Sequence, residues 1–239
     1  IYLDCNWKNN MKRYILLLLT TLFALTAGAQ SFNEMIKLYQ YASANAQLKA
    51  DSLQPSVVFI GDSIFEIWMW RRAEFFTGND YLNRGIGAQT SPQLLGRFRQ
   101  DVIELHPQAV VLCVGVNDIA ENSGPYSEEY TLGCIRSCAE LARANGIKVI
   151  LCSVLPAAAC GWNPSVKGVP ALIDSLNAGI KAYAADQGFG FVDFNTPMRD
   201  ENGGLLKCYD FEDGVHPNVD AYIVMESLVK PVIERVLGQ

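Results

Sequence analysis

The sequence is poor in histidine and in charged residues, and it has no run of basic residues. Its 239 residues include two histidines, 18% are charged, and the formal net charge is −6. An acidic chain without clustered lysine and arginine argues against nucleic acid or an anionic membrane as a partner, because both require concentrated positive charge. Half of the residues are hydrophobic, which is enough for one sizeable core and too many for a disordered chain.

Metal and dinucleotide motifs are also missing. The chain has no Cys-x-x-Cys pair and no histidine-rich stretch, so we expect no metal ion. Residues 85–87 (Gly-Ile-Gly) lack the third glycine and the suitably placed acidic residue of a dinucleotide fingerprint. We therefore expect a protein that needs no cofactor.

No hydrophobic run near the N-terminus is long enough to cross a bilayer. Residues 14–25 form an apolar stretch of about 12 residues, against the roughly 20 that a spanning helix needs. A basic pair at 12–13 precedes it, and residues 26–29 (Thr-Ala-Gly-Ala) follow it. This order predicts a signal peptide over 11–29 and an exported protein, periplasmic or secreted. An N-terminal anchor helix is the alternative, but we expect no stable membrane insertion.

The segments on either side of the predicted signal peptide differ in kind. Residues 1–10 are polar and charged and precede Met11. We interpret them as a non-native upstream extension, because such a segment serves no purpose in export. Residues 30–239 then form the folded domain, in which we see no repeat and no linker.

Six cysteines lie within residues 30–239. Cys113 and Cys152 fall inside apolar runs, which predicts buried thiols. An oxidising compartment permits disulfides. Among the cysteines, Cys160 and Cys208 form the most favourable pair, because both lie in predicted loops.

Short apolar runs alternate with longer amphipathic segments along this domain. We predict strands at 57–60, 109–114, 149–154 and 190–194, and a short second strand that ends near Asn83, since these runs are nearly continuous in apolar residues. We predict helices at 31–48, 91–104, 127–145, 170–187 and 217–236. The alternation predicts an α/β domain whose five-stranded parallel sheet has helices on both faces. Ligands of such sheets bind at the carboxyl ends of the strands.

The first strand runs directly into residues 61–64 (Gly-Asp-Ser-Ile). Ser63 is thereby predicted at the carboxyl end of a central strand, where a helix or turn begins. Backbone N–H groups at a helix N-terminus favour negative charge, which suits a serine nucleophile. An ordinary N-cap serine is the alternative.

A nucleophilic serine requires a base, and two histidines are available. His106 enters its strand at the amino end, on the side away from Ser63. His216 follows Asp213 by three residues, just before the last predicted helix, so that Asp213 can accept the Nδ1–H of the imidazole and fix its tautomer. The alternative is a capping aspartate beside a surface histidine, which would leave the serine without a base.

Acyl transfer also requires hydrogen-bond donors for the oxyanion. Asn117 follows the third strand in residues 115–118 (Gly-Val-Asn-Asp), and its amide can donate an N–H. Gly87 follows the second strand, and its backbone can approach a substrate closely. Each residue alone is equally compatible with an ordinary turn.

The four motifs together resemble those of the SGNH (GDSL-type) hydrolases. Residues 61–64 resemble block I, Gly87 block II, residues 115–118 block III, and residues 213–217 (Asp-Gly-Val-His-Pro) block V. The relatives of the platelet-activating-factor acetylhydrolase catalytic subunits look closest. The resemblance implies a flavodoxin-like three-layer α/β/α sandwich. It further implies a triad of Ser63, Asp213 and His216, and an oxyanion hole formed by Ser63, Gly87 and Asn117.

Aromatic residues near the predicted site suggest the substrate. Phe65, Trp68 and Trp162 are candidates for lining a small apolar pocket or stacking on a sugar ring, although Trp68 can equally well pack a helix. We predict an esterase that hydrolyses short-chain esters, with acetyl as the expected acyl group, on carbohydrate or another small molecule. A lysophospholipase or thioesterase, a catalytically inactive binding module and a flavin protein of this fold are the alternatives. No Ser/Thr-rich phosphate loop follows the first strand to support the last of these.

Overall fold

The computed structural model describes residues 31–238, which fall into two units. The described part of the first unit, residues 31–35, contains the short helix α2 (Phe32–Met35). The second unit begins at Ile36 and holds all the other elements. The predicted extension at 1–10 and the signal peptide at 11–29 lie outside the described residues.

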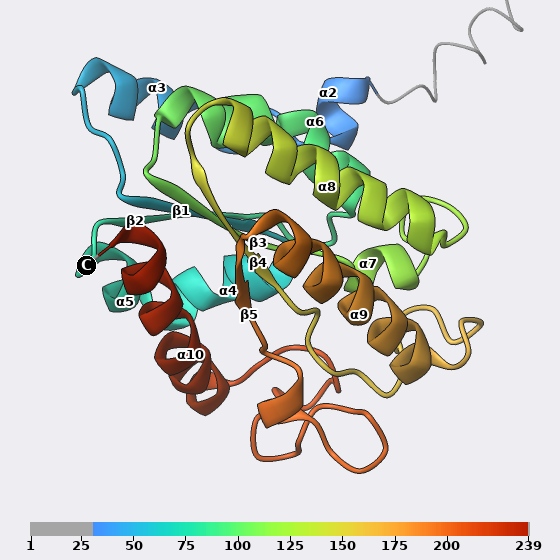
Figure 1. Cartoon of the computed structure of the whole chain (residues 1–239). Coiled ribbons are helices and arrows are strands. Elements are labelled where there is room, and N and C mark those ends of the chain that lie inside the picture. Colours follow the sequence, from blue (N-terminus) through green and yellow to red (C-terminus); the bar gives the residue numbers. More distant parts are fainter. Residues whose placement is uncertain (1–30, 239) are drawn as a thin grey trace, which may run out of the picture. The chain divides into compact units, whose positions relative to one another are not determined.

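Five parallel strands form the centre of the second unit (Figure 1). They are β1 (Val57–Gly61), β2 (Tyr81–Gly85), β3 (Ala109–Cys113), β4 (Lys148–Cys152) and β5 (Gly190–Val192). Their order in the sheet is β2-β1-β3-β4-β5, the flavodoxin-like order, in which β1 and β3 meet at the point where the chain reverses direction across the sheet. The predicted α/β fold and its five-stranded parallel sheet are confirmed.

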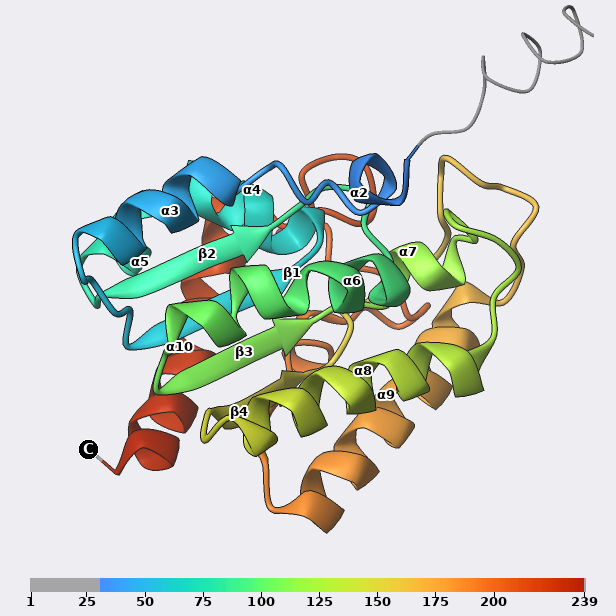
Figure 2. The same ribbon diagram turned by 90° about the horizontal axis from the view of Figure 1, so that it is seen from above.

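Helices cover both faces of the sheet (Figures 1 and 2). One face carries α6 (Ser91–Asp101), α8 (Glu128–Ala144) and α9 (Val169–Gln187), with α3 (Ala42–Ala50) packed against α6. The other face carries α4 (Ser63–Arg71), α5 (Ala73–Thr77) and α10 (Val219–Leu237). The short helix α7 (Val116–Ile119) follows β3 directly.

Each strand contributes side chains to two separate apolar layers. In β1, Val58 and Ile60 pack against α6, whereas Val57 and Phe59 pack against α4 and α5. This alternation follows from the two-residue period of a strand. It explains why the central strands β1 and β3 are continuous apolar runs, because all of their residues are buried on one face or the other. Burial of these layers is the main force that holds the sheet and helices together.

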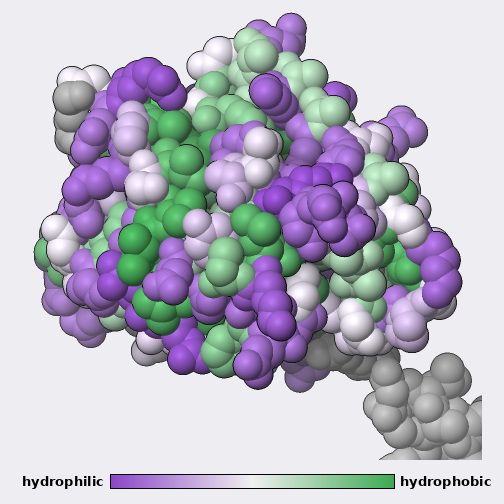
Figure 3. Space-filling model, turned by 90° about the horizontal axis from the view of Figure 1, so that it is seen from below, coloured by the Kyte–Doolittle hydropathy of each residue, from purple (hydrophilic) through white to green (hydrophobic). Residues whose placement is uncertain are grey.

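The surface below the sheet in Figure 1, where α10 and the segment after β5 lie, mixes apolar and polar residues. Figure 3 shows hydrophobic residues there in separate patches among hydrophilic ones. The exposed apolar side chains of α10 include Val219 and Ile223, near the start of the helix. Within residues 31–238, no helix combines the length and hydrophobicity needed to cross a membrane.

Two sequence-based expectations about local structure need correction. The helix predicted over 31–48 is broken, with turns between α2 and α3. The disulfide expected between Cys160 and Cys208 is absent: Cys160 is fully buried in the apolar layer below α8 and α9, whereas Cys208 is exposed in the segment after β5. Cys113 and Cys152 are buried thiols, as predicted.

Candidate active site

Ser63 begins α4 immediately after β1. Asp62 caps this helix, and its Oδ1 accepts the N–H of Ile64 at 3.0 Å. Gly61 lets β3 and α4 approach β1 closely, because a Cβ there would lie 2.5 Å from the carbonyl oxygen of Cys113 and 3.0 Å from the Phe65 ring. Ser63 is thus held by backbone geometry at the carboxyl edge of the sheet, where parallel sheets bind ligands.

His216 lies against Ser63, and Asp213 lies against His216. The His216 Nε2 is 2.9 Å from the Ser63 Oγ, and its Nδ1 is 2.6 Å from the Asp213 Oδ2. The ring carries 21% side-chain exposure, so one side of the site is open to solvent. The structure therefore brings together the three side chains that the sequence analysis grouped, in the order required for proton transfer from serine to histidine.

The loop before α10 fixes the orientation of both acid and base. The other carboxylate oxygen of Asp213 accepts the backbone N–H groups of Val215, at 2.9 Å, and of His216, at 2.8 Å. Partial burial raises the pKa of Asp213, but these N–H groups and the His216 ring outweigh burial and hold the pKa below its ordinary value. Asp213 is consequently ionised near neutral pH and accepts the Nδ1–H, which leaves Nε2 unprotonated toward Ser63.

The position predicted for His106 is confirmed. This residue ends a short 3-10 turn (Ile103–Leu105) ahead of β3, is exposed, and lies at the amino end of that strand. It is therefore on the side of the sheet opposite Ser63.

The loop after β2 is bonded to an acceptor on α4, Glu66, that the sequence analysis missed. The backbone N–H of Gly87 donates to the Glu66 Oε2 at 2.8 Å, and the Gly87 carbonyl accepts from the Lys37 Nζ at 3.1 Å. A Cβ on Gly87 would lie 3.9 Å from the Ser63 Cβ, which places this loop beside the nucleophile. The next residue, Ala88, has a left-handed φ of 65°, and its N–H has no partner among residues 31–238.

Asn117 lies in α7 with 4% of its surface exposed. Its Nδ2 donates to the carbonyl of Gln89 at 3.1 Å, and its Oδ1 accepts from the Asn122 Nδ2 at 2.9 Å. A positive φ of 145° at Gly115 and the close approach of Val154 require a glycine before this helix. The second Nδ2 hydrogen of Asn117 is left over for a ligand.

A buried polar network around Arg97 connects α6 to the end of β1 and to the loop after β2. Arg97 on α6 is completely buried and pairs with Asp101 at 2.9 Å. Its guanidinium also donates to the carbonyl of Gly61, at 3.0 Å, and to the side chain of Gln89. The same side chain therefore reaches the residue two before Ser63 and the residue whose carbonyl holds Asn117.

Two of the three predicted substrate-contacting aromatics do not reach the surface. Phe65 and Trp68 are fully buried, so this prediction is wrong for both. Both pack on Phe59 of β1, and Trp68 also stacks on Tyr222 of α10. Together with Ile64, they form the core-facing stripe of α4. The alternative reading of Trp68, that it packs a helix, is correct.

Trp162 is the predicted aromatic that remains accessible. It lies in the segment between β4 and α9, is 48% exposed, and donates its Nε1–H to the Asn122 Oδ1 at 2.8 Å. Asn122 also donates a hydrogen bond to Asn117. It therefore connects the indole to the candidate oxyanion donor. No signal in the sequence indicates that Asn122 links the two.

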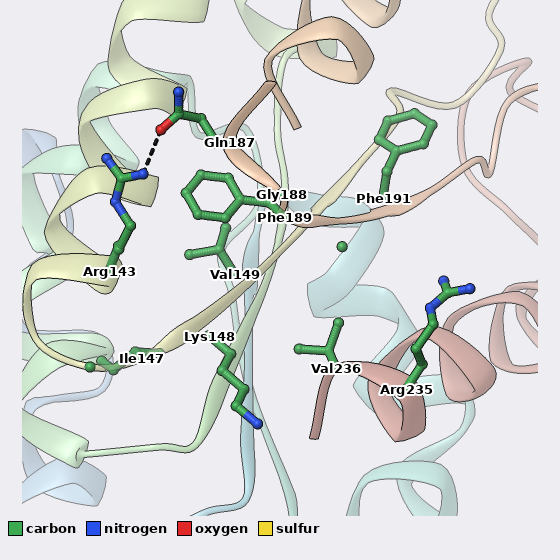
Figure 4. A pocket seen from close by; sticks show the side chains of 12 residues that line it. Arg143, Ile147, Lys148, Val149, Gln187, Gly188, Phe189, Phe191, Arg235 and Val236 are labelled. Carbon is green, nitrogen blue, oxygen red and sulfur yellow. Dashed lines mark hydrogen bonds between the residues drawn. The ribbon is translucent and has the colours of Figure 1, made fainter. Parts of the chain in front are cut away.

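A large cavity elsewhere in the unit has no connection with these residues. It measures about 660 Å³ and lies at the amino ends of β4 and β5 (Figure 4). Its lining combines Arg143, Lys148, Phe189 and Arg235 with apolar neighbours. It includes none of Ser63, Asp213 and His216, which lie at the opposite edge of the sheet.

Among the described residues, no group of three His, Cys, Asp or Glu side chains could hold a metal ion.

Comparison with known proteins agrees with the fold and the motifs. The profile of the GDSL-like Lipase/Acylhydrolase family matches residues 59–223, which include Ser63, Asn117 and His216. The chain belongs to this family and is an acylhydrolase of the esterase type. No protein with a curated description matches the chain.

Solved structures extend the likeness over most of the chain. A Bacteroides fragilis structure described as that of an acylhydrolase is 48% identical, with a TM-score of 0.81, over 84% of this chain and 98% of the other. A GDSL-like lipase from Bacteroides thetaiotaomicron is 47% identical, with a TM-score of 0.81, over 86% and 99%. An acetylxylan esterase from Geobacillus stearothermophilus, 18% identical with a TM-score of 0.60 over 77% and 94%, shares the fold.

Proposed function

We propose that the protein is a serine esterase in which Ser63 is the nucleophile, His216 the general base and Asp213 the residue that orients the base. The observation that carries the proposal is the continuous hydrogen-bonded chain from the Ser63 Oγ through His216 to the Asp213 carboxylate. In this arrangement, His216 takes the serine proton as the Oγ attacks an ester carbonyl. It then returns the proton to the leaving alcohol, and a water molecule hydrolyses the acyl-enzyme with His216 again as base.

The oxyanion of each tetrahedral intermediate requires donors beside Ser63. We propose the Ser63 N–H, the free Nδ2 hydrogen of Asn117, and a backbone N–H from the loop at 87–88. Gly87 can serve only when its N–H leaves Glu66. The Ala88 N–H needs no such exchange, because it has no partner among the described residues.

Labelling with a fluorophosphonate tests the triad directly. The reagent should attach covalently to the peptide that contains Ser63, because phosphonylation uses the same nucleophile, base and oxyanion donors as acyl transfer. His216→Ala should abolish labelling, whereas replacement of the other histidine, His106→Ala, should leave it intact. An unlabelled wild-type protein would favour the alternative of an inactive binding module.

We further propose that the acyl group is short, with acetyl esters of carbohydrates as the preferred class. A cavity of about 10 Å³ is lined by Asp62 and Ile64, which flank Ser63 in the sequence, and by Val154, Leu155 and Val215. This volume holds about one water-sized group, which supports a small acyl group. The acetylxylan esterase of the same fold and the exposed indole of Trp162 support a carbohydrate as the alcohol.

A series of p-nitrophenyl esters from acetate to decanoate tests the acyl length. We expect kcat/KM to be highest for acetate and to fall with each added pair of carbons. A maximum at eight carbons or more would instead support the lysophospholipase or thioesterase alternative. Release of acetate from acetylated xylan or acetylated monosaccharides then tests the alcohol.

We also propose that the enzyme acts outside the cytoplasm. The proposal rests on the order of basic, apolar and small residues over 11–29. Expression of the full chain followed by cell fractionation should place the protein outside the cytoplasm, with Gln30 as its new N-terminal residue. Retention of residues 11–29 in a membrane fraction would support an anchor helix instead.

A further inference from the structure

Three side chains outside the triad form a line of hydrogen bonds that ends at the candidate oxyanion donor. The Trp162 Nε1–H donates to the Asn122 Oδ1 at 2.8 Å, and the Asn122 Nδ2 donates to the Asn117 Oδ1 at 2.9 Å. The Asn117 Nδ2 then donates to the carbonyl of Gln89 at 3.1 Å. These residues come from the segment after β4, the segment after α7, and α7 itself.

The direction of every bond in this line is determined by its two ends. An indole N–H can only donate, and a backbone carbonyl can only accept. Asn122 must therefore turn its oxygen to Trp162 and its nitrogen to Asn117. Asn117 must then turn its oxygen to Asn122 and its nitrogen to Gln89. An amide that rotated by 180° would place oxygen against oxygen at one contact and nitrogen against nitrogen at the other.

The orientation of Asn117 matters because an amide has one donating side and one accepting side. Only the Nδ2 can stabilise an oxyanion, and its second hydrogen is the one left over after Gln89 is satisfied. The carbonyl of Gln89 bonds the nitrogen of the Asn117 amide, and the Asn122 Nδ2 bonds its oxygen. Asn122 also donates to the carbonyl of Ala88, at 3.4 Å, so that it contacts the neighbouring donor loop as well.

The loop that carries Trp162 is itself anchored to α7. The Asn163 Nδ2 donates to the carbonyl of Ala120, the residue that ends this helix, at 2.9 Å. The indole is therefore held at its ring nitrogen, and the next residue is held by its side chain, although almost half of the surface of Trp162 is exposed.

We propose that Asn122 is a positioning residue, held by Trp162, that fixes the amide of Asn117 with its free N–H toward the oxyanion. The inference rests on the proposed function, because it assigns a role in that same site. Asn122 acts through Asn117 and does not touch the substrate. The segment after β4 thereby contributes to transition-state stabilisation, although it holds no member of the triad.

The role predicts a specific kinetic pattern on p-nitrophenyl acetate. Asn122→Ala should lower kcat by about tenfold with little change in KM, since the donor becomes misoriented but is not removed. Asn117→Ala removes the donor and should cost about 100-fold or more. Asn122→Asp is nearly isosteric and keeps the bond to Trp162, but it offers only acceptors to Asn117, so it should lower kcat at least as far as Asn122→Ala.

A double-mutant cycle separates this role from a general structural one. In the Asn117→Ala background, Asn122→Ala should have no further effect on kcat, because the residue through which it acts is gone. Trp162→Phe keeps an aromatic ring but loses the N–H, and should reproduce part of the loss in kcat. Asn145, an exposed asparagine that ends α8 and donates to Leu141, provides the matched control: Asn145→Ala and Asn145→Asp should leave both constants unchanged.

The outcomes that overturn the inference differ from those that overturn the proposed function. The positioning role would be overturned if the Asn122 variants and Trp162→Phe kept the wild-type kcat. It would also be overturned if Asn122→Ala lowered kcat equally in the presence and absence of Asn117. In both cases Ser63-dependent hydrolysis would stand. Failure of the wild-type protein to react with a fluorophosphonate at Ser63 would overturn the proposed function and the inference with it. Unfolding midpoints of the variants show whether any loss of kcat reflects loss of folded protein.

Discussion

At the scale of single residues, the candidate site depends on which backbone groups are already bonded. Gly87 was predicted as an oxyanion donor because glycine allows close approach, but its N–H is bonded to Glu66. Ala88 follows it with a left-handed φ and a free N–H. Strained conformations of this kind cluster at functional sites. The sequence could indicate the loop, whereas the choice between adjacent N–H groups depends on hydrogen bonds that only the folded chain defines.

The left-handed backbone of Ala88 leads to a prediction for stability. Ala88→Gly should stabilise the protein by about 0.5 kcal/mol, because relief of the left-handed strain, about 1–2 kcal/mol, exceeds the entropic cost of glycine, about 0.5–1 kcal/mol. Urea denaturation measures the difference. Ala178→Gly in the exposed interior of α9 is the matched control and should cost about 1 kcal/mol. An equal decrease in the free energy of unfolding of both variants would contradict backbone strain at Ala88.

Asp62 leads to a prediction for the pH dependence of stability. Burial raises the pKa of its carboxyl from an ordinary 3.8 to about 7, against the opposing effect of the Ile64 N–H. The folded state thus binds this proton more tightly than the unfolded state, so the contribution of Asp62 to stability falls as pH rises from about 4 to about 7. Asp62→Asn keeps the cap to Ile64 and should remove this dependence.

The measurement is the free energy of unfolding of both proteins between pH 4 and pH 8. Asp62→Asn should gain on the wild type as pH rises, by up to about 4 kcal/mol, since each pKa unit corresponds to about 1.4 kcal/mol. A difference between the two proteins that stays constant over this range would contradict an elevated pKa for Asp62.

At the scale of secondary-structure elements, the strands and the apolar stripe of α4 could both be predicted, whereas the role of Asn122 could not. Strands covered on both sides are continuous apolar runs, and this pattern found all five. In α4, residues 64, 65 and 68 are apolar at helical spacing and face the core, a stripe that was available in the sequence. Phe65 and Trp68 were nevertheless predicted as substrate contacts, because they follow Ser63 closely in the sequence. Asn122 gave no signal, since a turn asparagine has no periodicity to interpret.

The buried Arg97 links α6 to the strand that carries the nucleophile. Arg97→Met should destabilise the protein by about 3–5 kcal/mol, because it leaves the buried carboxylate of Asp101 without its ion-pair partner. Urea denaturation should show the loss. Arg99→Met, at an exposed position of the same helix, should change stability by no more than about 0.5 kcal/mol. Similar values for the two variants would contradict the role of the buried pair.

At the scale of the whole second unit, the sheet is the scaffold, and the candidate site residues lie at the carboxyl ends of its strands. Ser63, the proposed nucleophile, follows β1. The loop at 87–88 follows β2, Asn117 follows β3 and Trp162 follows β4, whereas Asp213 and His216, the proposed acid and base, precede α10. Parallel strands deliver these segments to one edge although they are far apart in the sequence. This is why four short motifs were enough to predict the fold and the grouping of the triad. Substrate preference depends on loop packing, which no motif encodes.

The central claim, that Ser63 performs acyl transfer with His216 as its base, is tested most directly by one comparison of turnover. Wild-type protein and Ser63→Ala are assayed side by side on p-nitrophenyl acetate, with equal unfolding midpoints as evidence that both are folded. Loss of the nucleophile should lower kcat by about 10⁴-fold or more, to the background of the assay. Turnover by Ser63→Ala at the wild-type rate would contradict the assignment of this site.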